Sequence, residues 1–210
     1  MPLTADVDVV NLCLVRIAEN TITDLQENSK VARVMRSVYE PSRDSLLSEY
    51  RWNFAIRRTS LAPTSGGAEF GFANKFRLPD DCLSFIGIYD ENEDQRNYTS
   101  SKLPYKVEGN SLYFDGTAPQ IFYVRAVTNV REFHPLFTDA LAWKMAVDSA
   151  YGLSTGVDLV ARADAMFDKV IRKAKAVNAI QTTPEILEST EWLDSRAAPP
   201  GPFRAGPIYW

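Results

Sequence analysis

Apolar residues recur at steps of three and four near both ends of the chain, whereas apolar and polar positions alternate in its middle. Steps of three and four place side chains on one face of a helix. The first run therefore predicts a helix over residues 6–20. Thr4 or Asp6 is placed to cap its first turn, and Asn20 suits the left-handed residue that ends a helix.

A second periodic run extends from Ser29 to Tyr50 and is interrupted by Pro41. Proline lacks the backbone N–H that a helix interior needs, and it crowds the preceding turn. The periodicity resumes after it with Leu46 and Leu47. The pattern predicts either one helix kinked at Pro41 or two abutting helices, and it favours the kinked helix.

Residues 52–130 change to the period of two that is typical of half-buried strands. Runs of β-branched and aromatic residues are separated there by turn residues, and Gly109-Asn110 has the form of a two-residue hairpin turn. The middle of the chain thus predicts an antiparallel sheet. Its expected strands cover residues 52–56, 75–78, 83–89, 105–108, 111–114 and 120–127.

Helical periodicity returns at Pro135, which fits the first turn of a helix because its missing N–H costs nothing there. The segment up to Tyr151 is apolar almost all round, which predicts a helix that is buried on several sides and ended by Gly152. Thr155 and Asp158 have the spacing of a capping box. A last long helix is therefore expected to begin after Thr155.

Residues 181–210 combine five prolines with several large apolar side chains. Prolines at this density exclude a continuous helix or strand, yet disordered tails are usually poor in large apolar groups. We expect either an extended arm that buries its aromatic rings on another surface, or an arm that wraps around its own body. The candidate anchors of this arm are Trp192, Phe203, Tyr209 and Trp210.

This order of elements predicts an α+β fold, in which a helical bundle is interrupted by an antiparallel β-sheet insertion. Residues 1–51 and 131–180 are assigned to a helical domain, and residues 52–130 to a β domain inserted between the helices. Residues 181–210 are assigned to the extended C-terminal arm, rich in proline and aromatic residues.

The composition is that of an ordinary globular protein, with 45% hydrophobic and 24% charged residues in a chain of 210. The 23 basic and 27 acidic residues give a formal net charge of −4. Basic residues are scattered, as at Arg33, Arg57 and Lys173, so tight phosphate-driven binding of nucleic acid is not expected. No apolar run approaches the roughly 20 residues that a bilayer span requires.

His134 is the single histidine, so any Ser/His/Asp or Cys/His mechanism would have to use it. It directly precedes Pro135 at a capping position, which favours a structural role. Cys13 and Cys82 are interpreted as small buried residues, because no nucleophile motif surrounds them. Two cysteines also cannot form a disulfide scaffold or a four-ligand zinc site. The sequence predicts no catalytic, metal or cofactor site.

A calcium site is the remaining candidate for a bound ion. Asp90, Asn92 and Asp94 have the first three spacings of an EF-hand loop. Gln95 stands where that loop needs glycine, and Ser101 stands where it needs a bidentate acid. The segment is therefore interpreted as a solvated loop.

Several short stretches follow one another along most of the chain. They are NLCLVRIAE at 11–19, ITDL at 22–25, NSKVAR at 28–33, YEPSRD at 39–44, RWNFA at 51–55, LPDDC at 78–82, YKVEG at 105–109, FHPLF at 133–137 and WLDSR at 192–196. In this order and spacing the chain resembles the tail tubular protein A, or head-to-tail adaptor, family of short-tailed bacteriophages (podoviruses) and related prophages. His134 departs from the family pattern, in which an acidic helix cap is expected.

The resemblance implies an interaction protein and not an enzyme. Members of the family form a dodecameric ring under the portal protein and offer their β domain to the tail nozzle or tube, so that DNA passes through the channel. By this resemblance we expect a structural virion protein, located in the tail connector and assembled in the bacterial host cytoplasm. Its expected partners are the portal protein, the nozzle protein and further copies of itself, with no specific DNA binding and no membrane.

Two other classes of function remain as alternatives. One is a small hydrolase that uses Cys13 or Cys82 with His134, and the other is a monomeric cellular protein-binding module with its arm folded back. Replacing His134 by alanine separates the first alternative from an assembly protein, because only the enzyme should lose activity.

Overall fold

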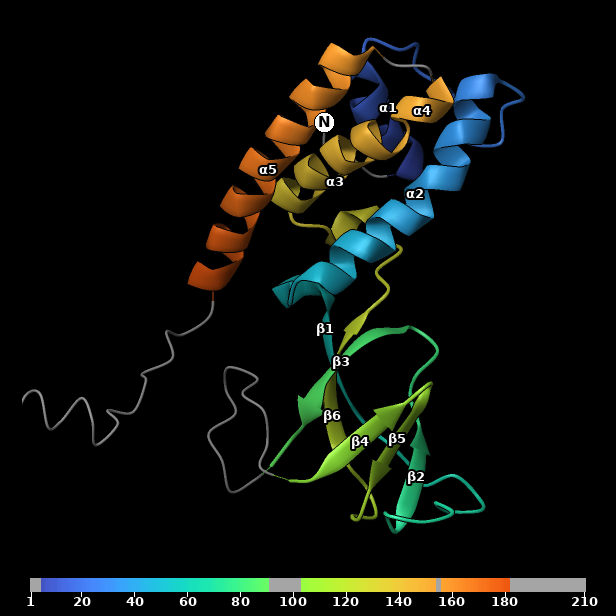
Figure 1. Ribbon diagram of the computed structural model, residues 1–210, viewed down its shortest axis with the longest axis vertical. Helices are drawn as coiled ribbons and strands as arrows, with labels where there is room; N and C mark the ends of the chain where they lie inside the picture. Colours follow the sequence, from blue (N-terminus) through green and yellow to red (C-terminus); the bar gives the residue numbers. More distant parts are fainter. Residues whose placement is uncertain (1–4, 91–102, 154–155, 182–210) are drawn as a thin grey trace, which may run out of the picture.

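The computed structural model describes residues 5–90, 103–153 and 156–181, and it has the α+β organisation expected from the sequence. The helices gather at one end of an elongated molecule and the strands at the other (Figure 1). The described helices are α1 (Asp6–Arg16), α2 (Lys30–Glu49), α3 (Pro135–Asp148), α4 (Ala150–Leu153) and α5 (Val157–Ile180). The described strands are β1 (Ile56–Ser60), β2 (Asn74–Arg77), β3 (Cys82–Ile88), β4 (Tyr105–Glu108), β5 (Ser111–Phe114) and β6 (Gln120–Arg125).

Helix α1 is shorter than expected, because it ends at Arg16 and not near Asn20. Ala18 has a left-handed backbone with φ of 59°, and the N–H of Glu19 donates to the carbonyl of Leu14 at 2.9 Å. This bond is that of a Schellman motif, so Ala18 takes the position that the sequence analysis assigned to Asn20.

The N-terminal cap of α1 also differs from both expected residues. Ala5 occupies the N-cap position, and its N–H donates to the carboxylate of Asp8 at 3.0 Å. Asp6 lies inside the helix, where its carboxylate accepts a hydrogen bond of 2.8 Å from the hydroxyl of Tyr39. Thr4 lies outside the described residues.

Helix α2 begins as expected, with Oγ of Ser29 accepting a hydrogen bond of 3.1 Å from the N–H of Ala32. Pro41 lies inside this single continuous helix, so the alternative of two abutting helices is wrong. Pro41 and Ser37 are both exposed, so the carbonyl that proline leaves without its usual helical donor is on the side that faces water. The helix tolerates proline there because solvent can satisfy that carbonyl.

The strand expected over residues 52–56 is wrong, because the 3-10 turn η1 (Asn53–Ala55) precedes β1. Trp52 is only 1% exposed, and its indole Nε1 donates to the carbonyl of Leu46 at 2.9 Å. Trp52 is therefore placed by packing against the end of α2, and Phe54 by packing against Phe137, and not by the pleat of a strand.

Helix α3 begins at Pro135 as expected. Gly152 does not end it, because Gly152 lies inside the separate short helix α4. A Cβ on Gly152 would lie 2.8 Å from Cγ1 of Val34, so glycine lets α4 approach α2 closely. The cap expected at Thr155 is also wrong, because the N-cap of α5 is Gly156; Thr155 itself lies outside the described residues.

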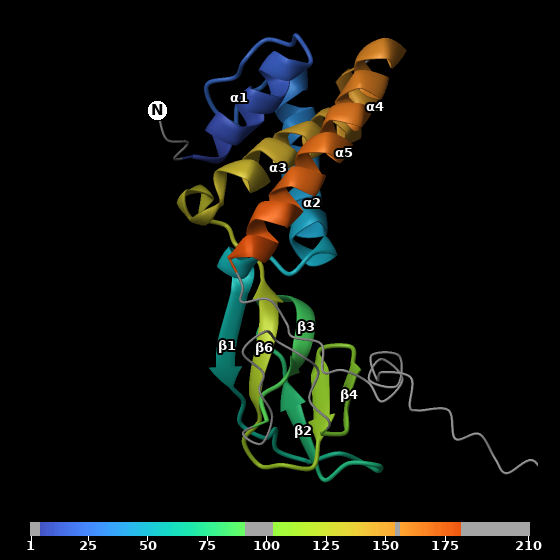
Figure 2. The ribbon, with the colours of Figure 1, turned by 90° about the vertical axis from the view of Figure 1, so that its left-hand side faces the viewer.

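The described strands form two three-stranded antiparallel sheets and not the single sheet expected. One has the order β1-β6-β3 (Figure 2) and the other the order β2-β5-β4 (Figure 1). The hairpin expected at Gly109-Asn110 is confirmed, since it joins β4 to β5 and Gly109 has φ of 57°. The second sheet is thus built around a local hairpin, whereas the first depends on pairing between distant segments.

Two hydrophobic cores meet at β6. Phe122 and Val124 face the helical core, which fills the helical layer and its junction with the β1-β6-β3 sheet. Ile121 and Tyr123 face the sheet core, which lies between the two sheets. Successive side chains point to opposite faces of a strand, so one strand can line both cores. The sheet core consists of Leu61, Phe76, Leu78, Ile88, Leu112, Ile121 and Tyr123.

Candidate interaction surfaces

An apolar groove lies where α4 meets the first turns of α5, beside the end of α3. Its volume is about 460 Å³, and it is lined by Val147, Ala150, Tyr151, Val157, Val160, Ala161 and Asp164. Tyr151 is 98% exposed and Val157 is 83% exposed. Large apolar side chains that cluster in water are typical of a surface that a partner covers.

Helix α3 holds this apolar groove in place. It packs against α1, α2 and α5, and its side chains are buried on several sides, as the sequence predicted. The buried residues of α3 are Phe137, Thr138, Ala140, Leu141, Ala142, Met145 and Ala146. Because close-packed interiors resist deformation, α3 fixes where α4 begins and where the first turns of α5 lie.

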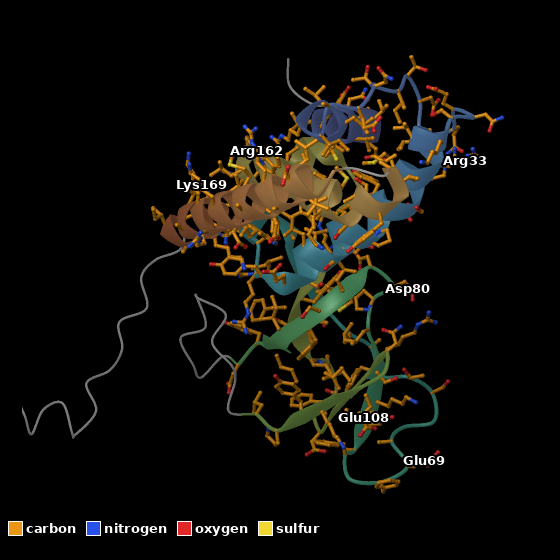
Figure 3. All side chains as sticks on the ribbon, turned by 45° about the horizontal axis from the view of Figure 1, so that its top comes forward. Arg33, Glu69, Asp80, Glu108, Arg162 and Lys169 are labelled. Carbon is orange, nitrogen blue, oxygen red and sulfur yellow. The ribbon has the colours of Figure 1, made fainter. Side chains whose placement is uncertain are left out.

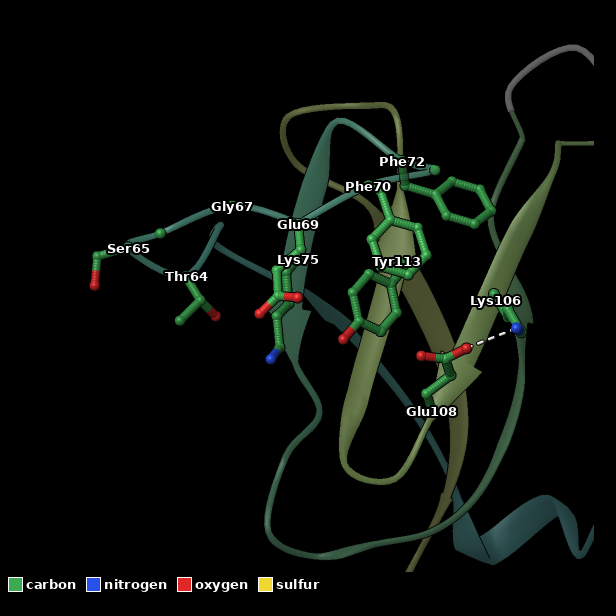
Figure 4. Close-up of a pocket in the computed structure, with 12 residues that line it drawn as sticks. Thr64, Ser65, Gly67, Glu69, Phe70, Phe72, Lys75, Lys106, Glu108 and Tyr113 are labelled. Carbon is green, nitrogen blue, oxygen red and sulfur yellow. Dashed lines mark ion pairs between the residues drawn. The ribbon is translucent and has the colours of Figure 1, made fainter.

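A second surface, which we call the aromatic hollow, lies on the face of the β2-β5-β4 sheet that is turned away from the sheet core (Figure 4). Its volume is about 490 Å³, and it is lined by Thr64, Ser65, Gly66, Gly67, Glu69, Phe70, Gly71, Phe72, Lys75, Lys106, Glu108 and Tyr113. The loop before β2 forms one wall. Gly67 and Gly71 have φ of 62° and 86° there, a left-handed backbone that favours glycine.

Three aromatic rings line the aromatic hollow. The ring centroids of Phe72 and Tyr113 are 6.5 Å apart with an interplanar angle of 39°, and Nζ of Lys75 lies 5.8 Å from the centroid of Tyr113. Phe70 is 86% exposed on the adjoining loop. The hollow therefore offers aromatic faces to any molecule that enters it.

Some charged side chains of the aromatic hollow form an ion pair with each other, and others do not. Lys106 and Glu108 form an ion pair of 2.6 Å on β4. Glu69 is exposed and makes no ion pair within the described part of the chain. As far as the structure describes the chain, the Glu69 carboxylate is therefore available to a cation.

The residues considered for Cys/His chemistry lie on different elements. His134 is the N-cap of α3, where its Nδ1 accepts a hydrogen bond of 3.2 Å from the N–H of Leu136. Cys13 is buried in the helical core, and burial raises the pKa of its thiol to about 12. Cys82 is half-buried and not fully buried as expected, and burial with the nearby Asp81 carboxylate also raises its pKa. Thiols with raised pKa values are protonated near neutral pH and are poor nucleophiles.

The charged residues are spread over separate elements. Figure 3 places Arg33 on α2 and Arg162 and Lys169 on α5. Arg57 on β1 pairs with Asp81 at 3.2 Å. Among the residues that the structure describes, no group of three or more His, Cys, Asp or Glu side chains could hold a metal ion. Within the same ranges, no helix is long and apolar enough to cross a bilayer.

The expected anchors of the C-terminal arm, Trp192, Phe203, Tyr209 and Trp210, lie outside the described residues, and their role stays a prediction. The calcium-like segment also lies outside them from residue 91 onward, although Asp90 is described and buried.

The sequence analysis identified neither the apolar groove nor the aromatic hollow. Tyr151 and Val157 belong to helical patterns that also fit a buried face, so their exposure depends on how α4 and α5 pack. Phe70 and Phe72 gave a usable signal, because two phenylalanines stand in a glycine-rich loop that has no apolar period of its own.

Comparison of the chain with protein-family models finds no match, and comparison with curated proteins finds none either.

Proposed function

We propose that this chain is a structural virion protein, a head-to-tail adaptor that forms a ring between the portal protein and the tail nozzle. DNA passes through the channel of this ring without specific binding. The proposal starts from the resemblance of the ordered sequence stretches to the tail tubular protein A family. The structural observation that best supports it is the apolar groove, because a subunit completed by copies of itself leaves such area uncovered when alone.

The elongated shape is compatible with this role. The helical layer (Figure 2) would form the body of the ring, and the apolar groove between α4 and α5 would be part of its contact surface. The two sheets project from the helical layer and would face the nozzle. The ring is dodecameric by resemblance.

The C-terminal arm would add a second attachment. Its aromatic residues Trp192, Phe203, Tyr209 and Trp210 can act as anchors on a neighbouring subunit or on the portal protein in the assembled ring. Replacing all four by alanine is expected to weaken attachment to capsids. Unchanged attachment would contradict this part of the proposal.

The groove is tested by mixing the chain with portal rings and imaging the products by electron microscopy. The chain is expected to form rings on the portal, and Val157→Asp is expected to prevent this because it places a charge in the apolar contact. Val15→Asp is the matched control, since Val15 is also an exposed apolar residue (64%) but lies on α1. Normal rings from Val157→Asp would contradict the groove as the interface, and no portal binding by the unaltered chain would contradict the adaptor role.

The proposed role is not enzymatic. His134→Ala removes the side chain that caps α3 and should leave incorporation into particles intact if the fold is retained. Turnover of a defined small molecule by the purified chain, lost in His134→Ala, would instead support the hydrolase alternative.

A further inference from the structure

The C-terminal arm contains a segment with a recognisable binding pattern. Residues 199–204 read Pro-Pro-Gly-Pro-Phe-Arg, which has the form Pro-x-x-Pro-x-Arg. Proline-rich segments favour the polyproline II helix, which has three residues per turn. In such a helix, two prolines spaced as Pro199 and Pro202 are would lie on the same side about 9 Å apart. Aromatic-lined grooves recognise such segments because the helix is preformed and costs little entropy to bind. Arg204 adds a cation at one end of the segment.

The aromatic hollow has the complementary features. Phe70, Phe72 and Tyr113 provide ring faces for two prolines, and covering Phe70 removes a largely exposed aromatic side chain from water. Glu69 adjoins Phe70 in the chain and makes no ion pair within the described residues, so its carboxylate can meet the guanidinium of Arg204.

We propose that the aromatic hollow binds residues 199–204 of the same chain. The linker formed by residues 182–198 can extend to about 60 Å, and its average span as a flexible coil is about 23 Å. A flexible tether that can span the distance to its site gives an effective concentration of up to millimolar, which exceeds the concentration of other copies in a micromolar solution. The segment of the same chain is therefore favoured over that of a second copy.

This inference goes beyond the proposed adaptor role and does not depend on it. Binding of residues 199–204 places Phe203 beside the aromatic hollow, so part of the arm is held on the β2-β5-β4 sheet in the free chain. The hollow thus acts as a docking site for a proline-rich peptide with a basic C-terminal end.

The test is disulfide trapping in the full chain. Ser65→Cys places a thiol at the rim of the aromatic hollow, and Ala205→Cys places one directly after Arg204. The native thiols compete poorly, since Cys13 is buried and the pKa of Cys82 is raised. Under mild oxidation, we expect rapid closure of a disulfide within one chain, seen as faster migration on a non-reducing gel. Variants that carry only one of the two added cysteines should not form this product.

Charge reversal tests whether disulfide closure depends on the proposed ion pair between Arg204 and Glu69. Arg204→Glu should slow closure at least about fivefold, because it replaces an attraction to Glu69 by a repulsion. Adding Glu69→Arg to that variant should restore the rate. Arg196→Glu is the matched control, since it changes the other arginine of the arm outside the bound segment, and it should leave the rate unchanged.

Three results would overturn the proposal. Closure that is equally fast with Pro199→Ala, Pro202→Ala and Arg204→Glu together would mean that the tether alone brings the thiols together. Failure of Glu69→Arg to rescue Arg204→Glu would contradict the assigned ion pair. Disulfides formed only between chains would contradict the assignment of the segment to the same chain. None of these results bears on binding to the portal protein, which is tested separately.

Discussion

The two cores of the molecule differ in what they hold together. The helical core combines side chains of α1, α2, α3 and α5 with one face of the β1-β6-β3 sheet. The sheet core combines side chains of the two sheets with Leu61 and Leu78, which directly follow β1 and β2. When a buried side chain is removed, local unfolding spreads to the helices and strands that contribute to the same core. Damage to the helical core should therefore loosen the helices and the β1-β6-β3 sheet, whereas damage to the sheet core should release the β2-β5-β4 sheet first, because that sheet contributes to no other core.

The two candidate surfaces also differ, both in the elements that carry them and in the side chains that line them. The apolar groove is built on helices that the helical core holds rigidly, and it is almost wholly apolar. The aromatic hollow lies on the smaller sheet and mixes aromatic rings with charges. Obligate interfaces between subunits are lined mainly by apolar side chains, whereas peptide-docking sites combine apolar or aromatic side chains with polar and charged ones. This contrast is why we propose a subunit contact for the groove and a peptide for the hollow.

The largest expected effect comes from Phe137→Ala in the helical core. Phe137 is fully buried, and its ring centroid lies 5.2 Å from that of Trp52 and 5.0 Å from that of Phe54. Removing the ring should lower the free energy of unfolding by about 4 kcal/mol, measured by urea denaturation. Hydrogen exchange should then accelerate in the helices and in the β1-β6-β3 sheet. Faster exchange in the helices alone would break the comparison between the cores.

Leu112→Ala should have a smaller and more local effect. Leu112 is fully buried in the sheet core, and its loss should cost about 3 kcal/mol. Amide exchange should accelerate in β2, β4 and β5 while α3 keeps its protection. Equal acceleration in α3 would show that the sheet core is not independent.

The junction between the helical layer and the first sheet is tested by Asn178→Ala. Oδ1 of Asn178 accepts from the N–H of Asn53 at 2.9 Å, and its Nδ2 donates to the carbonyl of Arg51 at 3.1 Å. Losing both bonds should lower the free energy of unfolding by about 2 kcal/mol. Val177→Ala changes the adjacent, half-buried residue and keeps both bonds, so it should cost less. An equal cost for the two variants would mean that these hydrogen bonds do not stabilise the junction.

The smallest effect is a pH dependence at Tyr123. Burial, then the hydroxyl's hydrogen bond of 3.0 Å to Asp81, raises the pKa of Tyr123 to about 12 from an ordinary value of 10.0. A raised pKa favours the protonated form in the folded state, so this stabilisation is complete below pH 10 and is lost as the pH rises through about 12. Tyr123→Phe should cost about 1 kcal/mol at pH 8 and should make the decline between pH 10 and 12 less steep. If the stability of this variant declines as steeply as that of the unaltered chain, other titrating groups cause the decline.

Local features of the fold could be predicted from the sequence, and features that depend on distant contacts could not. The hairpin at Gly109 was predicted because the turn itself requires a glycine. The start of α3 could be predicted because proline is favoured in the first turn of a helix, which Pro135 occupies. The division into two sheets was missed, because the pairing of β6 with both β1 and β3 joins segments far apart in the chain.

The errors in the sequence analysis have the same physical cause. Trp52 was expected in a strand, but its indole is buried against the end of α2 and the backbone follows with a 3-10 turn. Gly152 was expected to end a helix, but it serves a close contact with Val34. The candidate surfaces were missed because the exposure of Tyr151 depends on packing that no local pattern contains.

The central claim is that the apolar groove is covered when copies of this chain assemble. Hydroxyl-radical footprinting of Tyr151 tests it directly, since this side chain is 98% exposed in the free chain. We predict strong labelling of Tyr151 in the free chain and strong protection in rings purified on portal proteins, with Tyr89 as an internal reference on the β part. Equal labelling of Tyr151 in the free chain and in a portal-bound ring would contradict the claim.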